Sequence, residues 1–172
     1  MKINLHKKEP IFLDIETTGL NPTYGNRITC ICGKTQTDEF KDLQIEEPIL
    51  LNNFKDWLSN YSIEDYLLVT KNGKMFDIPF IMTRWSRNNN WKDLEFLLEY
   101  EHFDLHEITK SRVSLDDMTR LYGIENKSAS GLEAIKFWEN KEYQKIIDYC
   151  WDDVLITEKI YNIYNKLKRS KK

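Results

Sequence analysis

Two acidic residues, Asp14 and Glu16, lie two positions apart in an otherwise apolar run, IFLDIETTGL. Residues two apart on a β-strand share one face of the sheet, so the two carboxylates would lie side by side. Such carboxylates repel one another unless a cation lies between them, and a hard divalent ion is the usual partner. On its own, this short spacing fits a metal site and a solvated strand end carrying two ordinary acids equally well.

A third acid, Asp153, falls at a core-facing position of a predicted long helix. At roughly 100° per residue, one side of this helix forms an apolar stripe. The stripe consists of Ile146, Ile147, Cys150, Val154, Ile160, Tyr161 and Tyr164. Asp153 falls inside it, whereas Asp148 and Asp152 fall on the opposite, solvated face. A carboxylate facing the core needs a hydrogen-bond donor, an arginine or a metal ion, and Tyr149, one turn earlier, points to the same region.

A fourth acid, Asp77, follows an apolar segment and a turn, KNGK, and begins a predicted helix. Taken alone, this acid is explained better by a plain helix N-cap than by a functional role. Asp77 becomes informative together with the other acids, because three widely separated segments each bring an acid to the end of a strand or helix. In a mixed sheet of this size those ends can converge.

The hydrophobic pattern predicts elements in the order β, β, β, α, β, α, β, followed by helices. We expect extended segments over 11–15, 27–34, 39–45, 66–70 and 102–105. We expect helices over 47–60, from about Pro79, after the caps Ser114 and Ser130, and from Glu142 onward. This order predicts an α/β protein with a mixed sheet whose first strands form an antiparallel meander.

With 172 residues, the chain is long enough for one domain, which we expect over 1–165, followed by a basic tail over 166–172. The net charge of −3 excludes a uniformly basic, histone-like protein. Cys30, Cys32 and Cys150 lack metal-type CxxC spacing and are expected to be reduced core thiols. No signal peptide or membrane span is evident, so we expect a soluble, intracellular, cytoplasmic protein without a membrane partner.

Three segments, FLDIETTGL, NGKMFDIPF and YCWDDV, resemble motifs I, II and III of the DEDD 3′-to-5′ exonucleases of the ribonuclease H-like superfamily. The Tyr149-x-x-x-Asp153 spacing resembles the tyrosine (DEDDy) branch, as in family B DNA polymerase proofreading domains and stand-alone exonucleases. The histidine branch is disfavoured, because it needs a histidine at position 148, which is Asp148 here.

The resemblance implies a five-stranded ribonuclease H-like sheet, antiparallel in its first three strands and then parallel, flanked by helices. It implies that two divalent ions, Mg²⁺ or Mn²⁺, are held by Asp14, Glu16, Asp77 and Asp153. Tyr149 would orient or help deprotonate the attacking water. The positions that would contact the substrate are Thr17, Thr18, Leu20, Asn72 and Phe76.

The leading hypothesis is a metal-dependent exonuclease that hydrolyses phosphodiester bonds at the 3′ end of single-stranded DNA or RNA and releases nucleoside 5′-monophosphates. Two alternatives stay open: a catalytically silent nucleic-acid-binding or scaffold domain, and a structure-specific endonuclease using the same metals. The tail over 166–172 either adds phosphate contacts or is simply solvated. The choice of DNA or RNA, the oligomeric state and any protein partner in repair or replication are not determined by the sequence.

Overall fold

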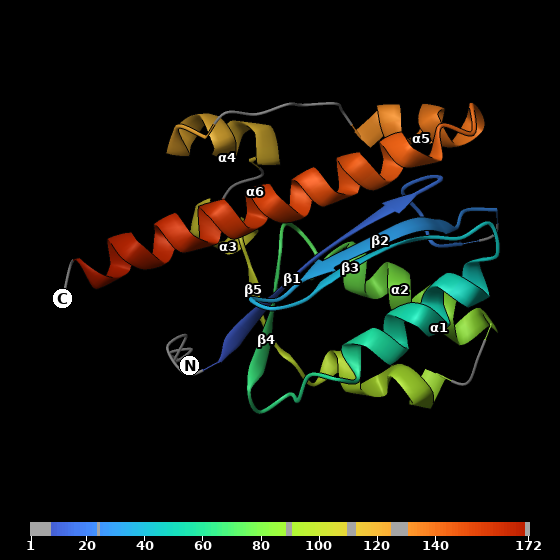
Figure 1. Cartoon of the computed structure of the whole chain (residues 1–172), viewed down its shortest axis with the longest axis horizontal. Helices are drawn as coiled ribbons and strands as arrows, with labels where there is room; N and C mark the ends of the chain where they lie inside the picture. Colours follow the sequence, from blue (N-terminus) through green and yellow to red (C-terminus); the bar gives the residue numbers. More distant parts are fainter. Residues whose placement is uncertain (1–7, 24, 89–90, 110–112, 125–130, 171–172) are drawn as a thin grey trace.

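Five strands form a single mixed sheet in a computed structural model that describes residues 8–23, 25–88, 91–109, 113–124 and 131–170. The strands are β1 (Glu9–Thr17), β2 (Ile28–Lys34), β3 (Glu39–Leu43), β4 (Tyr66–Thr70) and β5 (Glu101–Asp104). Their order in the sheet is β3-β2-β1-β4-β5. The first three strands pair antiparallel, and β1, β4 and β5 run parallel, which confirms the expected fold class (Figure 1).

Helices cover both faces of this sheet. They are α1 (Glu47–Leu58), α2 (Asp77–Asn88), the 3₁₀ helix η1 (Trp91–Leu98), α3 (His106–Thr109), α4 (Leu115–Tyr122), α5 (Gly131–Glu139) and α6 (Tyr143–Arg169). The long helix α6 crosses one face with α4 and α5 outside it, and α1 and α2 cover the other (Figure 1). None of the helices in the described ranges combines the length and apolar character needed to cross a membrane.

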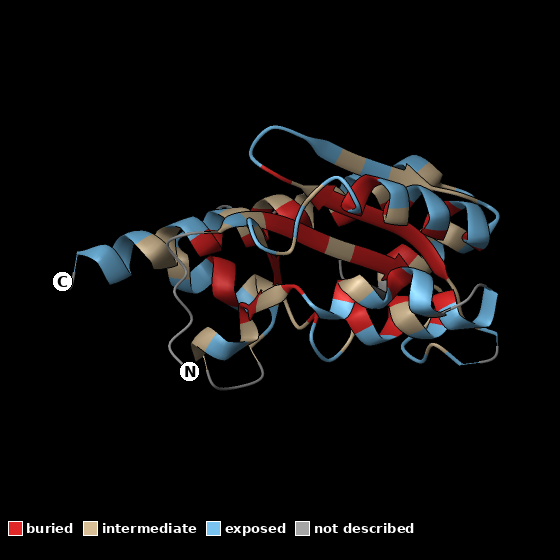
Figure 2. Ribbon diagram, turned by 90° about the horizontal axis from the view of Figure 1, so that it is seen from below, coloured by how far each residue is buried: buried red, intermediate tan, exposed pale blue. Residues whose placement is uncertain are grey.

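The central strand β1 divides its side chains between two cores, because successive residues of a strand point to opposite faces. Ile11, Leu13 and Ile15 pack into the core beneath α1 and α2. Phe12 packs into the second core, beneath α6, and Asp14 and Glu16 share its face of the strand. The strand is therefore buried along most of its length (Figure 2), and its two acids are aimed at the α6 side.

Two elements were not predicted from the sequence, η1 and α3. In η1 the buried residues Leu94 and Leu97 are three positions apart, which matches the period of a 3₁₀ helix. A hydrophobic pattern with the 3.6-residue period of an α-helix does not detect this spacing. The predicted cap Ser114 is confirmed, since its side chain accepts a hydrogen bond from the Asp117 backbone N–H. The other predicted cap, Ser130, lies outside the described residues.

Candidate active site

The four acids singled out by the sequence come from three elements that meet on the α6 side of the sheet. Asp14 and Glu16 come from β1, Asp77 begins α2, and Asp153 lies on α6. The nearest carboxylate oxygens of Asp14 and Glu16 lie within 4.8 Å of one another. The charges of both Asp77 and Asp153 act on these two carboxylates, so the structure brings all four predicted acids together.

Asp77 is fixed by the way in which β1 separates from β4. The two strands pair from Glu9 to Phe12 on the β1 side. Beyond that point, the backbone N–H of Ile15 donates to the Asp77 Oδ1 at 3.2 Å, so this carboxylate takes the place of a neighbouring strand. Asp77 is buried as a consequence, with only 3% of its surface exposed.

Electrostatic repulsion dominates this cluster. Burial, and then the charges of Asp77 and Asp153, raise the pKa of Asp14 and of Glu16 well above their ordinary values. Burial likewise raises the pKa of Asp77 to about 7, against two backbone hydrogen bonds that favour its charged form. No Lys or Arg in the described ranges forms an ion pair with any of the four.

Asp153 is partly buried, and burial followed by the charge of Asp116 raises its pKa to about 7. The hydroxyl of Tyr149 donates a hydrogen bond to this carboxylate and acts in the opposite direction. Burial and the charge of Asp153 raise the pKa of Tyr149 itself, so the phenol stays protonated at neutral pH. Tyr149 therefore points into the carboxylate cluster as a hydrogen-bond donor.

The predicted substrate residues after β1 lie in an ordered loop. The Thr17 hydroxyl donates to the Gly19 carbonyl at 2.8 Å, and the Thr18 hydroxyl accepts from the Arg27 backbone N–H at 3.0 Å. Leu20 follows with 84% of its side chain exposed, which is unusual for a large apolar residue. This loop and the loop after β4 leave the same edge of the sheet, because β1 and β4 are parallel.

The loop after β4 carries Asn72 and Phe76. Asn72 adopts a left-handed backbone conformation with φ of 65°, and its backbone N–H donates to the Asp104 carboxylate at 2.7 Å. The Phe76 ring is partly buried and lies 5.5 Å from that of Phe80 between ring centres. Asn72 is therefore held at the edge of the site, whereas much of Phe76 belongs to the core.

Three further residues at this edge were missed from the sequence. Asp104, at the end of β5, is almost completely buried and accepts hydrogen bonds from the backbone N–H groups of Asn72, Lys74 and His106. Asp116 adds a negative charge next to Asp153 from the first turn of α4. Burial lowers the pKa of Lys71, and the nearby charges of Asp104 and Asp77 oppose that shift. The position of Asp104 at the end of a parallel strand could have identified it as a site residue from the sequence. The proximity of Asp116 to Asp153 could not be predicted, because it depends on how α4 packs in the folded protein.

A pocket of about 630 Å³ opens beside this edge. It is lined by Lys71, Asn72, Met75, His106, Val113 and Ser114. Its volume is in the range of small-ligand sites, and its lining combines a cation, several polar groups and the 79% exposed side chain of Met75. The pocket thus adjoins the acidic cluster through Lys71 and Asn72.

The donors of the acidic cluster suit a hard divalent cation. All four acids offer carboxylate oxygens, which are the ligands that Mg²⁺ and Mn²⁺ prefer. Their mutual repulsion and the raised pKa of each would be relieved by positive charge. The residues present therefore fit a divalent-metal site.

Comparisons with known proteins agree with the observed fold. The family model of the RNase_H superfamily matches residues 11–165. Among solved structures, a family B DNA polymerase from the hyperthermophilic archaeon Pyrobaculum calidifontis matches with a TM-score of 0.70 at 15% sequence identity, over 87% of this chain and 23% of that one. No curated protein sequence matches. The match along 11–165 places this chain in the RNase H superfamily.

Proposed function

We propose that this protein is a two-metal-ion 3′-to-5′ exonuclease that shortens single-stranded DNA or RNA and releases nucleoside 5′-monophosphates. The observation that carries the proposal is the meeting of four carboxylates from three elements without a neutralising Lys or Arg among the described residues. Such an arrangement is unfavourable for folding and becomes favourable once cations bind. Membership of the RNase H superfamily supports a nucleic-acid hydrolase in general.

In this proposal Asp14, Glu16, Asp77 and Asp153 are the metal ligands. Two bound divalent ions would supply an activated water and neutralise the charge that develops on the leaving 3′ oxygen. Tyr149 would orient the attacking water through its hydroxyl, which is already a donor within the cluster. Asp77, locked by the Ile15 amide, would keep its carboxylate in place during the reaction.

The two loops at the edge of the sheet would hold the substrate. The exposed side chain of Leu20 would pack against the terminal base, and the Thr17–Thr18 backbone would contact its sugar and phosphate. Asn72 and Phe76 would lie beside the next nucleotide, where the 630 Å³ pocket opens. Lys71 would contact a backbone phosphate there, because it is a cation at the rim of an otherwise acidic site.

The decisive experiment is digestion of 5′-labelled single-stranded DNA and RNA of matched sequence, with Mg²⁺, Mn²⁺ or EDTA. We expect a metal-dependent ladder that shortens from the 3′ end, and a preference between the two sugars. Asp14→Asn should abolish the ladder, whereas Asp148→Asn, which changes an exposed acid of α6, should leave it unchanged.

Two other outcomes would overturn the proposal. Cleavage of a circular single strand would indicate an endonuclease, because a circle has no 3′ end. Failure of the folded, metal-loaded protein to cleave any strand, combined with retained binding of the labelled strands, would indicate a catalytically silent binding domain.

A further inference from the structure

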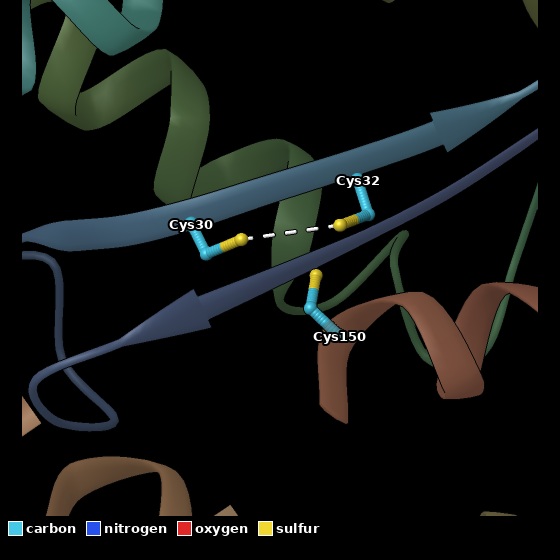
Figure 3. Close-up of side chains that lie close together, drawn as sticks. All are labelled: Cys30, Cys32 and Cys150. Carbon is cyan, nitrogen blue, oxygen red and sulfur yellow. Dashed lines mark hydrogen bonds between the residues drawn. The ribbon is translucent and has the colours of Figure 1, made fainter. Parts of the chain in front are cut away.

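All three cysteines of the chain converge on one point beside the acidic cluster. Cys30 and Cys32 come from β2 and Cys150 comes from α6, and their side chains point toward one another (Figure 3). The Sγ atoms of Cys30 and Cys32 are 3.9 Å apart, and all three sulfur atoms lie within 4.8 Å of one another. Each of the three residues has no exposed surface. The protein therefore contains a closed triangle of sulfur atoms.

The triangle has the dimensions of a metal–thiolate site. Zinc–sulfur bonds are about 2.3 Å long, so sulfur atoms that share an ion lie about 4 Å apart. The 3.9 Å between Cys30 and Cys32 already matches that edge. Cys150 lies on the helix opposite, and a small rotation of its side chain would complete the triangle.

A disulfide does not account for this cluster. Cys30 and Cys32 are two apart on one strand, which places their Cα atoms about 6.6 to 6.8 Å apart, at the upper limit for a disulfide. Their sulfur atoms are separated by almost twice the length of an S–S bond. All three cysteines are free, so all three sulfur atoms are available as ligands.

We propose that Cys30, Cys32 and Cys150 form a three-thiolate site for one thiophilic metal ion, of the class of Zn²⁺, Cd²⁺ or Cu⁺. Binding breaks three S–H bonds, forms three metal–sulfur bonds and releases three protons to solvent, with no change of oxidation state. Soft thiolate ligands select such ions over Mg²⁺ and Mn²⁺. The Sγ atom of Cys150 also lies within 4.8 Å of carboxylate oxygens of Asp14 and Glu16, so the two sites adjoin, and they differ in their donor chemistry.

The sheet register places the two sites side by side on the α6 face of the sheet. Cys32 lies opposite Asp14, and Cys30 lies opposite Glu16 in the β1–β2 pairing, so each thiol shares a face with its partner acid. Cys150 directly follows Tyr149, and its thiol donates to the Asp14 carbonyl at 3.4 Å. An ion at the sulfur triangle would therefore tie α6 to β2 immediately beside the residues that we propose for catalysis.

The test is a direct binding measurement that needs no catalytic activity. The protein is refolded with Cd²⁺ or Zn²⁺ in the presence of excess Mg²⁺, because the thiols are closed off in the folded chain and Mg²⁺ occupies the carboxylates. After desalting, we expect one Cd²⁺ or Zn²⁺ per chain and, with Cd²⁺, ultraviolet thiolate-to-metal charge-transfer absorption. Cys32→Ala and Cys150→Ala should each weaken binding by about 10²-fold or more.

Asp14→Asn is the matched control, since it alters the carboxylate site and keeps all three sulfur atoms. It should retain the bound ion and the charge-transfer absorption even though we expect it to lose hydrolysis. The proposal is overturned if the wild-type protein, folded by circular dichroism and with three titratable thiols after denaturation, carries no ion. It is equally overturned if the absorption survives in folded Cys150→Ala, or in folded Cys32→Ala, where survival would place the ion on Cys150 with Asp14 and Glu16. If one variant fails to fold, Cys30→Ala provides the same test.

Discussion

Two buried clusters of charge in this protein are organised in opposite ways. Glu47, in the first turn of α1, is almost fully buried and is held by Arg84 of α2 through Nε at 2.9 Å and a terminal nitrogen at 2.5 Å. The Ile28 backbone N–H also donates to the same carboxylate at 2.7 Å. The second cluster is the group of four acids that includes Asp14. These acids repel one another, and none of them forms an ion pair with a Lys or Arg among the described residues.

The contrast separates a structural role from a functional one. Burying a charge is unfavourable unless a partner compensates it. Glu47 has its partner inside the chain, and the pair joins α1, α2 and β2. The Asp14 cluster has no such ion pair in the described part of the chain, and a cation bound from solution would compensate it. We infer that the first cluster serves the fold and the second serves binding.

The largest expected effect separates Asp153 from its neighbour Asp152. Asp153→Asn should reduce the rate of 3′-end hydrolysis by about 10⁴-fold, equivalent to ~5 kcal/mol of lost transition-state stabilisation, because a proposed metal ligand is removed. Asp152→Asn should change the rate by less than ~3-fold, since that carboxylate falls outside the apolar stripe of α6. Single-turnover kinetics on labelled single strands measures both. Equal losses in the two variants would contradict the assignment.

A substitution in the compensated pair should affect folding and leave chemistry intact. Glu47→Gln leaves the buried Arg84 guanidinium without a counter-charge and should lower the free energy of unfolding by about 3 to 5 kcal/mol. The double variant Glu47→Leu with Arg84→Met should recover most of that loss, because no charge is then buried. Urea denaturation measures the stability, and the rate per folded molecule should equal that of the wild type. A variant with normal stability and reduced rate would reverse the comparison.

Much of the fold was accessible from the sequence because its signals are local. The alternation in β1 and the apolar run over 66–70 define strands within a few residues. The helical repeat of α6, which can be computed from the sequence alone, places Asp153 inside the apolar stripe and Asp152 outside it. The family resemblance supplied the order of the sheet, which local pattern leaves undetermined.

Features that depend on distant contacts could not be predicted in this way. Asp104 holds the Asn72–Lys74 loop only because β5 lies beside β4. Asp116 faces Asp153 only because α4 docks on α6. The sulfur triangle depends on the register of β2 and on the position of Cys150 on α6. Neither can be predicted from the spacing of the cysteines in the sequence.

Binding of Mg²⁺ or Mn²⁺ should stabilise the protein through the uncompensated carboxylate cluster. At about 100 times the dissociation constant, an ion that binds only the folded state contributes ~2.7 kcal/mol, and in a domain of this size the melting temperature should rise by roughly 5 to 10 °C. Scanning calorimetry with Mg²⁺ or Mn²⁺ against EDTA measures the rise. Glu47→Gln should keep it and Asp14→Asn should lose it. A rise that persists in Asp14→Asn would place the stabilising ion elsewhere.

The smallest expected effect is the pH dependence of the metal-free protein. The pKa of Asp77 and of Asp153 is raised to about 7 in the folded protein. A carboxylic acid whose pKa is raised by folding stabilises the fold fully below its ordinary pKa, near 4. This stabilisation is lost as the pH rises through the folded-state pKa. Two groups act in the opposite direction. Burial lowers the pKa of the partly buried His102 to about 4, and the neighbouring thiols of Cys150 and Cys30 lower the pKa of Cys32 to about 5, but these two groups oppose four carboxylates. In EDTA, the melting temperature should therefore fall by several degrees between pH 5 and 8. Asp77→Asn should make this fall shallower and Asp148→Asn should not, so identical slopes in the two variants would show that the cluster is compensated within the chain after all.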